Sequence, residues 1–204
     1  MSWSIDPIPE KDGKEDPKVE ALKLAIQNTK ALLFCAWPDK GAGFVKKTYP
    51  LAFADGRIFS IGAATRDGNP APKVGDGKPD FFLPGVELGI PVRTKTNERL
   101  GERPPETYVT YSGSSLSCAL AAGLAAMILH CVRKVDSKHA QSLMSYDGMK
   151  RAFESIHMSH HRWLAVGSFF RHQLTTQASG TERQRILTTI TNSFFSRMDL
   201  EHRL

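Results

Sequence analysis

The chain has 204 residues, of which 41% are hydrophobic and 24% charged, and its formal net charge is +6 at pH 7. These values are ordinary for a globular protein, and the length is sufficient for one domain with a substantial core. The three cysteines, Cys35, Cys118 and Cys131, leave at least one thiol unpaired and match no metal-ligand spacing. We therefore expect buried thiols, no metal site and no cofactor.

The sequence also predicts a chain without membrane segments. We expect no run of about 18 uncharged apolar residues, which is the length that a transmembrane helix needs. The first residues, Met-Ser-Trp-Ser-Ile-Asp-Pro, do not show the basic and then apolar pattern of a signal peptide. As written, the chain is expected to be cytoplasmic and not to contact a membrane.

Most of the excess positive charge lies in the last third of the chain. Residues 131–204 carry 11 Lys and Arg against 6 Asp and Glu, and six of the seven histidines. A basic surface can bind nucleic acid or anionic lipid. Because no basic and aromatic interleaving typical of a nucleic-acid module is present, we interpret the charge as a solvated surface and consider nucleic acid an unlikely partner.

In chain order, the first half shows alternating helical and strand patterns. Asp16 and Pro17 form a helix start, followed by apolar residues at helical spacing. Residues 31–36 form a continuously apolar run, typical of a strand in a parallel sheet that is buried on both faces. Residues 57–63 predict a second strand, and the glycines and prolines of residues 64–80 predict a loop.

The second half is predicted to be mainly helical. Residues 91–107 are polar and are interpreted as a surface insertion, residues 115–132 as a core helix, and residues 146–156 as another helix. Helices alternating with buried strands indicate an α/β fold, with a mostly parallel sheet flanked by helices. We divide the chain into a domain at 1–156 and a basic, helical C-terminal extension of unknown role at 157–204.

The most informative motif opens the predicted core helix. Residues 113–123 read Gly-Ser-Ser-Leu-Ser-Cys-Ala-Leu-Ala-Ala-Gly. The unpaired N–H groups at a helix N-terminus face a developing negative charge, so a serine there is well placed as a nucleophile. The segment resembles the catalytic-serine motif of the subtilisin-like serine proteases, G-T-S-x-A-x-P-x-x-A-G. The resemblance implies that Ser115 is the nucleophile, although Ala119 replaces the proline of the motif.

Three further segments resemble this family in the family's own order. Residues 32–41 are similar to the strand that ends in A-A-G-N-x-G, residues 57–63 to the V-I-x-V-G-A strand, and residues 78–86 to R-P-D-x-x-A-P-G-x. Four matches over residues 31–130 identify the chain as a member of the subtilisin-like family with a partial subtilisin-like fold.

One departure concerns the oxyanion hole, where the family uses an asparagine amide. The aligned residue is Asp39, and an ionised carboxylate would repel the oxyanion. Some relatives, among them fungal subtilases that end this strand in Cys-Ser-x-x-Asp-x-Gly, share the aspartate, and the pattern of this chain is closest to theirs. Asp39 is thus a candidate oxyanion-hole residue. The alternative is a turn residue next to Pro38.

A second departure concerns the general base. In the family the order is Asp, His, Ser, with D-[ST]-G and H-G-T-x-x-A-G motifs, but every histidine of this chain follows Ser115. Residues 1–4, Met-Ser-Trp-Ser, resemble the mid-domain strand N-M-S-L-G. This implies that the chain is the C-terminal half of a catalytic domain. By the same resemblance Trp3 and Ser4 would flank the first specificity pocket, opposite Ala36 and Trp37.

Two functional hypotheses follow. The first is a serine-type endopeptidase acting on peptide or protein substrates, with Ser115 as nucleophile and with its aspartate and histidine supplied by a missing N-terminal half in a longer chain. The alternative is a truncated, catalytically inactive module that acts in protein interaction or regulation. Because the base is absent from this chain, we expect the chain alone to be inactive. A basic nucleic-acid-binding module is a weaker third reading.

Overall fold

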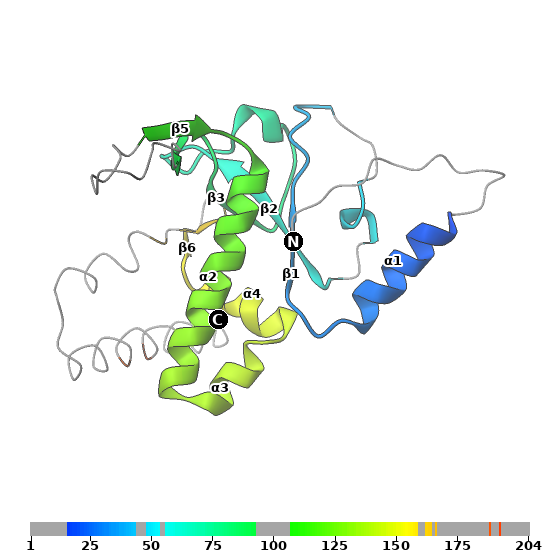
Figure 1. Cartoon of the computed structure of the whole chain (residues 1–204), viewed down its shortest axis with the longest axis vertical. Coiled ribbons are helices and arrows are strands. Elements are labelled where there is room, and N and C mark those ends of the chain that lie inside the picture. The colour runs from blue at the N-terminus through cyan, green and yellow to red at the C-terminus, as the bar shows by residue number, and fades with distance from the viewer. Residues whose placement is uncertain are drawn as a thin grey trace, which may run out of the picture.

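The structure is a computed structural model that describes residues 16–43, 48–53, 56–92 and 107–158, together with 162–164 and single positions at 166, 188 and 192. Its centre is a five-stranded sheet with the strand order β1-β2-β3-β7-β6 (Figure 1). The strands are β1 (Leu33–Ala36), β2 (Ile58–Ala64), β3 (Phe81–Pro84), β6 (His157–Met158) and β7 (Trp163–Leu164). The strands β1, β2, β3 and β7 run parallel, and β6 pairs antiparallel with β7. The predicted α/β class with a mostly parallel sheet is confirmed.

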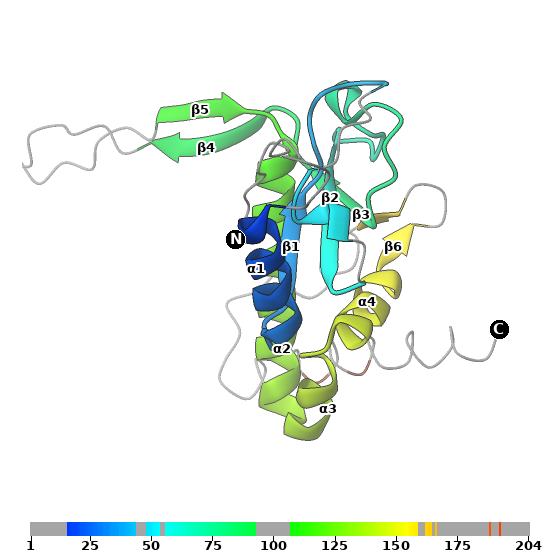
Figure 2. The same ribbon diagram turned by 90° about the vertical axis from the view of Figure 1, so that its right-hand side faces the viewer.

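In the part of the chain that the structure describes continuously, four α-helices accompany the sheet. They are α1 (Pro17–Asn28), α2 (Ser114–Val135), α3 (Ser137–Ser142) and α4 (Tyr146–Glu154), and two short 3-10 turns span Leu51–Phe53 and Pro72–Val74. The helix α1 begins as predicted, because the Asp16 carboxylate accepts a hydrogen bond from the Lys18 N–H at 2.7 Å. The long helix α2 crosses the sheet, with α3 and α4 at its C-terminal end (Figures 1 and 2). The short helix α3 was not predicted.

Aromatic rings fill the core between the sheet and the helices. Phe34 of β1 and Phe59 of β2 are register partners whose rings stack at 5.0 Å. Phe153 of α4 lies 5.7 Å from Phe59 and 5.3 Å from Phe81. On α2 the inward face carries small residues, among them the buried Ala121. Small side chains let the helix backbone approach the sheet closely, and this approach fixes the position of its N-terminus.

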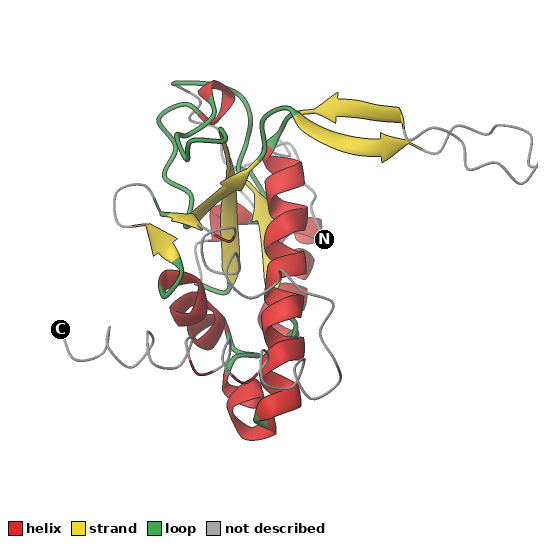
Figure 3. Ribbon diagram, turned by 90° about the vertical axis from the view of Figure 1, so that its left-hand side faces the viewer, coloured by secondary structure: helices red, strands yellow, loops and turns green. Residues whose placement is uncertain are grey.

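The structure differs from the prediction at the segment taken as a polar surface insertion. Residues at both of its ends belong to an antiparallel two-stranded ribbon, β4 (Leu88–Val92) and β5 (Thr107–Tyr111). The ribbon projects from the body of the molecule (Figures 2 and 3). Side chains along each strand alternate between its two faces, and this period-2 pattern is hard to recognise in a strand of five residues.

The sheet also continues past the predicted boundary at residue 156. The strands β6 and β7 follow directly after α4, and Trp163 of β7 is the register partner of Phe82 in β3. Leu164 is buried in the main core. Residues up to Leu164 therefore contribute to the sheet. The predicted helical extension falls almost wholly outside the described residues.

The prediction that the chain has no run of apolar residues long enough to span a membrane is wrong. The helix α2 meets that test by length and composition, with a mean hydropathy of 1.9 over its most apolar 18-residue window. Of that window 39% is buried inside the molecule, and α2 contributes Ala121, Ala125 and Ile128 to the core. A core helix explains this composition as well as a membrane helix would, so the finding is weak evidence for a span.

The prediction of buried thiols is confirmed, and it has a measurable consequence. Cys35, Cys118 and Cys131 are buried and reduced. Burial, with a contribution from Cys118, raises the pKa of the Cys35 thiol to about 12, and burial also raises the pKa of Cys131. The native Cys35 and Cys131 thiols therefore stay protonated at pH values where the same thiols in the unfolded chain, with an ordinary pKa of 9.0, ionise.

We predict that Ellman's reagent at pH 8 leaves the native thiols unmodified and modifies all of them in guanidinium chloride. Because the thiolate is favoured only in the unfolded chain, the free energy of unfolding should fall as the pH rises above about 9. Reaction of the native protein at the rate of the unfolded chain would contradict the burial of these groups.

Candidate active site

The two adjacent serines at the N-terminus of α2 differ in their exposure to solvent. Ser114 is fully buried, whereas the side chain of Ser115 is exposed on the first turn of the helix. Gly113 precedes them with φ of 153°, a backbone angle that favours glycine, and the turn closes through the Leu116 N–H, which donates to the Gly113 carbonyl at 3.1 Å. The helix start therefore presents one hydroxyl, that of the predicted nucleophile Ser115, to solvent.

Asp39 caps this helix from a distant part of the chain. Gly113 provides no side-chain cap. Instead, the Asp39 carboxylate accepts hydrogen bonds from the Ser114 N–H at 2.7 Å and from the Ser114 hydroxyl at 2.6 Å. Asp39 follows β1 by three residues and lies 75 positions before Ser114. A negative charge at a helix N-terminus is favourable, because it interacts with the unpaired N–H groups and with the helix dipole.

The Ser114 hydroxyl joins the same helix start to the sheet. It accepts a hydrogen bond from the Ala63 N–H of β2 at 3.0 Å while donating to Asp39. Each polar atom in this buried cluster therefore has a partner, which buried polar groups require. The sequence did not indicate this double role of Ser114.

A third set of contacts fixes the helix start to the end of β3. The Gly113 N–H donates to the Gly85 carbonyl at 2.7 Å. One turn along the helix, the buried Ser117 hydroxyl lies 3.0 Å from the carbonyls of both Leu83 and Pro84. The Ser117 side chain therefore connects α2 to β3, a role that the sequence did not indicate. Four serines between residues 112 and 117 are visible in the sequence, but their spacing does not say which distant segments their hydroxyls contact.

The geometry bears directly on the predicted role of Asp39. Both carboxylate oxygens accept hydrogen bonds from Ser114. An ionised Asp39 therefore acts as a helix cap and has no proton to donate to an oxyanion; donation would require a protonated carboxyl group. Its role in an oxyanion hole remains a prediction, and the capping role is a finding that the turn interpretation did not contain.

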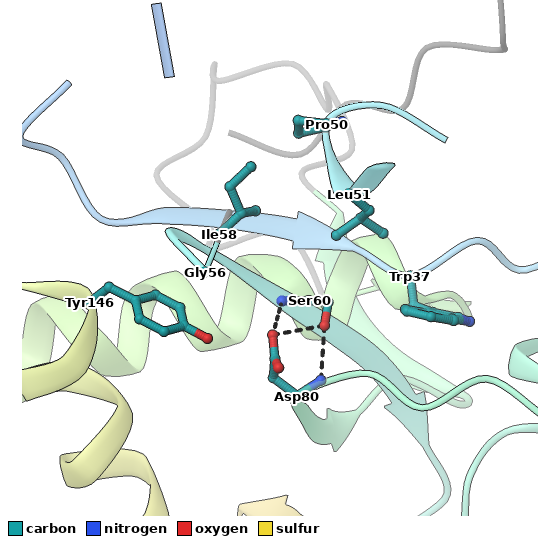
Figure 4. Close-up of a pocket in the computed structure, with 8 residues that line it drawn as sticks. All are labelled: Trp37, Pro50, Leu51, Gly56, Ile58, Ser60, Asp80 and Tyr146. Carbon is teal, nitrogen blue, oxygen red and sulfur yellow. Dashed lines mark hydrogen bonds between the residues drawn. The ribbon is translucent and has the colours of Figure 1, made fainter. Parts of the chain in front are cut away.

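The predicted substrate-binding residues fall into two groups. Trp3 and Ser4 lie outside the described residues. Ala36 ends β1 and packs against the main core. Trp37 lines a pocket of about 210 Å³ together with residues that the sequence did not indicate (Figure 4). Its lining consists of Trp37, Pro50, Leu51, Gly56, Ile58, Ser60, Asp80 and Tyr146.

This pocket is polar at one side and does not include Ser115. The Asp80 carboxylate accepts hydrogen bonds from the Ser60 N–H and hydroxyl, both at 2.8 Å (Figure 4). Burial, followed by the nearby Asp80 charge, raises the pKa of Tyr146 to about 12. At neutral pH Tyr146 is therefore a phenol that can donate a hydrogen bond. Neither Ser115 nor Asp39 lines the pocket, whereas Trp37, predicted to flank the first specificity pocket, does.

No general base for Ser115 is found among the described residues. His130 lies exposed near the far end of α2. His139 bonds to Asp136 at the start of α3, and His157 bonds to the Glu154 carbonyl. The remaining histidines, His160, His161, His172 and His202, lie outside the described residues. In the part of the chain that the structure describes, no cluster of His, Cys, Asp and Glu could hold a metal ion.

Comparison with solved structures places this arrangement in a known fold. The S218A mutant of the protease domain of PatA superimposes with a TM-score of 0.50 at 17% identity, over 78% of this chain and 54% of that chain. The chain has a subtilisin-like fold. It spans about half the length of that protease domain. The prenylagaramide maturation protease PagA is also similar, with a TM-score of 0.48 at 15% identity over 87% of this chain and 58% of that one. No protein-family model and no curated protein sequence matches the chain.

We predict that Asp39 stabilises this subtilisin-like fold through its cap. Asp39→Ala should lower the free energy of unfolding by about 2–3 kcal/mol, because it leaves two polar groups of the buried Ser114 without a partner. Asp39→Asn should cost only about 1 kcal/mol, because the amide oxygen still accepts from the Ser114 N–H. Urea denaturation measures both. Equal effects of the two substitutions would contradict a capping role.

A second prediction concerns the close approach of α2 to β3 at Gly85. A Cβ atom at Gly85 would lie 2.2 Å from the Ser117 hydroxyl and 2.7 Å from the Ala63 Cβ. Gly85→Ala should therefore destabilise the protein by about 1–3 kcal/mol through overpacking. The matched control is Gly123→Ala on the exposed side of α2, where a Cβ meets nothing within 4 Å. This change should stabilise by about 0.5–1 kcal/mol. Thermal unfolding compares the pair.

Proposed function

We propose that the chain is the nucleophile-bearing half of a serine-type endopeptidase, with Ser115 as the attacking residue. The supporting observation is the exposed Ser115 hydroxyl at the start of a 22-residue helix whose first turn is bonded to β2, to the end of β3 and to Asp39. A nucleophile needs such a fixed position, because small displacements of reacting atoms cost large factors in rate. The subtilisin-like fold supports the same assignment, and so does the fact that the chain spans about half the length of the PatA protease domain.

The chemistry also needs a base and oxyanion donors. Ser115 would attack the peptide carbonyl, with its own N–H at the helix start as one donor to the oxyanion. The proton of the Ser115 hydroxyl has to go to a histidine oriented by an aspartate, and among the described residues neither stands in a position to act. We infer that the missing N-terminal half of a longer chain provides both. This proposal includes two finer assignments. The chain is the C-terminal half of a catalytic domain, and its sequence pattern is closest to that of fungal subtilases. The substrate is a peptide or protein.

The alternative function is an inactive subtilase-like module that acts in protein interaction or regulation. The specific observation in its favour is Asp39, whose carboxylate occupies the helix N-terminus beside Ser115. An anion there opposes the development of a second negative charge on a substrate carbonyl. Reading the transcript upstream of Met1 separates the two. Motifs of the D-[ST]-G and H-G-T types would support the peptidase, whereas their absence would support the inactive module. Cytoplasmic location and the lack of membrane and nucleic-acid partners stay predictions in both cases.

We predict that the chain alone neither hydrolyses casein nor reacts rapidly with a fluorophosphonate probe. Without a base the Ser115 hydroxyl keeps its proton, and only the residual effect of binding and of the helix N-terminus is left. Intact-mass spectrometry after incubation with the probe measures this directly. Ser112→Ala and Ser115→Ala serve as matched variants.

Rapid modification that disappears in Ser115→Ala and persists in Ser112→Ala would contradict the predicted inactivity of the chain. When the chain is joined to a half that contains both upstream motifs, labelling should appear at Ser115. Failure of that joined protein to label would contradict the proposed peptidase function.

A further inference from the structure

The pocket beside Trp37 contains a carboxylate that is firmly held but has no positively charged partner. The Oδ2 atom of Asp80 accepts hydrogen bonds from the Ser60 N–H and hydroxyl, both at 2.8 Å, and the Asp80 N–H lies 2.9 Å from the Ser60 carbonyl and hydroxyl oxygens. Within the described ranges, the second carboxylate oxygen, Oδ1, accepts no hydrogen bond, and no basic side chain forms an ion pair with Asp80. A partly buried charge without a counter-charge is unfavourable, and a cationic ligand would relieve this cost.

The charges around the Tyr146 end of the pocket are mainly negative. After burial, the contributions that raise the pKa of the Tyr146 phenol come from Asp80, Asp147 and Glu154. A weaker contribution of opposite sign comes from Arg162, which neither lines the pocket nor forms an ion pair with Asp80. A positively charged ligand is therefore attracted to this pocket, whereas an anion is repelled.

Two aromatic rings stand on either side of the carboxylate, and both are fixed by their neighbours. In Figure 4, Asp80 lies between Tyr146 on one side and Trp37 on the other. The Tyr146 ring stacks on Phe59 with the ring centroids 4.4 Å apart. The Trp37 indole lies so close to Gly77 that a Cβ atom there would be 2.1 Å from its Nε1 atom. The pocket is thus formed before any ligand binds, which reduces the entropic cost of binding.

The lining favours a small organic cation over a metal ion. Calcium takes about six to eight oxygen ligands, whereas Asp80 is the one charged residue of this lining, and the described residues contain no cluster of His, Cys, Asp and Glu that could hold a metal ion. Leu51 and Ile58 offer aliphatic surface to an alkyl or aryl group, and aromatic rings attract cations. The volume of about 210 Å³ is below the range of roughly 300–1,000 Å³ typical of drug-sized ligands, so the ligand is small.

We propose that this pocket binds a small primary amine in its ammonium form, with Asp80 as the counter-ion. The ammonium N–H groups would bond to Oδ1 of Asp80 and to the phenol oxygen of Tyr146, and the alkyl or aryl part would pack between Trp37 and Leu51. No residue of the turn that carries Ser115 lines the pocket. The inference therefore goes beyond the proposed peptidase function and does not depend on it.

The first test compares two ligands on the unchanged protein. The probe is para-fluorobenzylamine, which is titrated with the whole chain at neutral pH and followed by fluorine NMR. Its neutral counterpart, para-fluorobenzyl alcohol, has a similar shape but lacks the charge. The alcohol should bind about tenfold more weakly or worse, because a hydrogen bond between charged groups is replaced by a weaker one. This comparison does not depend on the folding of a variant.

The second test uses variants of the pocket. Asp80→Asn keeps an acceptor for Ser60 and removes the charge, and it should weaken binding of the amine about tenfold or more. Asp147→Asn is the matched control, since it removes a nearby carboxylate that does not line the pocket, and it should change binding by less than about twofold. Tyr146→Phe keeps the ring that stacks on Phe59 and loses the phenol oxygen, so it should weaken binding about threefold or more.

Four results would overturn the proposal. Equal binding of the amine and the alcohol would exclude recognition of the charge, and equal losses in Asp80→Asn and Asp147→Asn would reduce it to a general surface potential. Displacement of the amine by an equimolar amount of calcium or potassium ions would assign Asp80 to an inorganic cation. Loss of amine binding in Ser115→Ala would place the probe at the nucleophile. Failure of the joined protein to label Ser115 would reject the peptidase and leave the amine result standing, so the two failures are distinguishable.

Discussion

The bidentate contact between Asp39 and Ser114 is the interaction on which the arrangement of this molecule depends. It brings together the end of β1 and the start of α2, two segments that are 75 positions apart in the chain. Through the Ser114 hydroxyl the contact continues to Ala63 in the middle strand of the sheet. One buried serine therefore fixes the helix along its axis, while the small residues of its inward face set its distance from the sheet. The exposed position of Ser115 is the consequence.

The same contact creates a conflict between stability and catalysis. A carboxylate is a good cap for a helix that has no local one, since it satisfies N–H groups and interacts with the helix dipole. A developing oxyanion would need the same N–H groups and the same helix dipole at this helix N-terminus. An amide at position 39 could accept from Ser114 with its oxygen and still donate with its nitrogen, whereas the carboxylate can only accept. The aspartate therefore shifts the balance from transition-state stabilisation toward a firmly held helix start.

The sequence predicted those features that have a local cause. The Asp16–Pro17 helix start, the buried strands near 31–36 and 57–63 and the long core helix follow from capping chemistry and apolar patterning, and the structure confirms them. The β4–β5 ribbon and the strands after residue 156 could not be recognised, because two to five residues carry too little periodicity. The capping of α2 by Asp39 and the hydrogen bonds of Ser114 and Ser117 to the sheet depend on contacts between segments that are distant in the chain. Local patterns contain no information about such contacts.

The structure fixes the position of the Ser115 hydroxyl, but no described residue is placed to take its proton. Hydrogen bonds of residues 112–117 hold the start of α2 to the end of β3 and to the base of the β4–β5 ribbon. None of these contacts involves a group that could take the Ser115 proton, and His130 lies on the same helix about four turns away. Rigid placement of the Ser115 hydroxyl contributes to hydrolysis only when a base takes its proton. The two proposed functions, the peptidase half and the interaction module, therefore differ in whether a base reaches Ser115 and not in the fold that holds it.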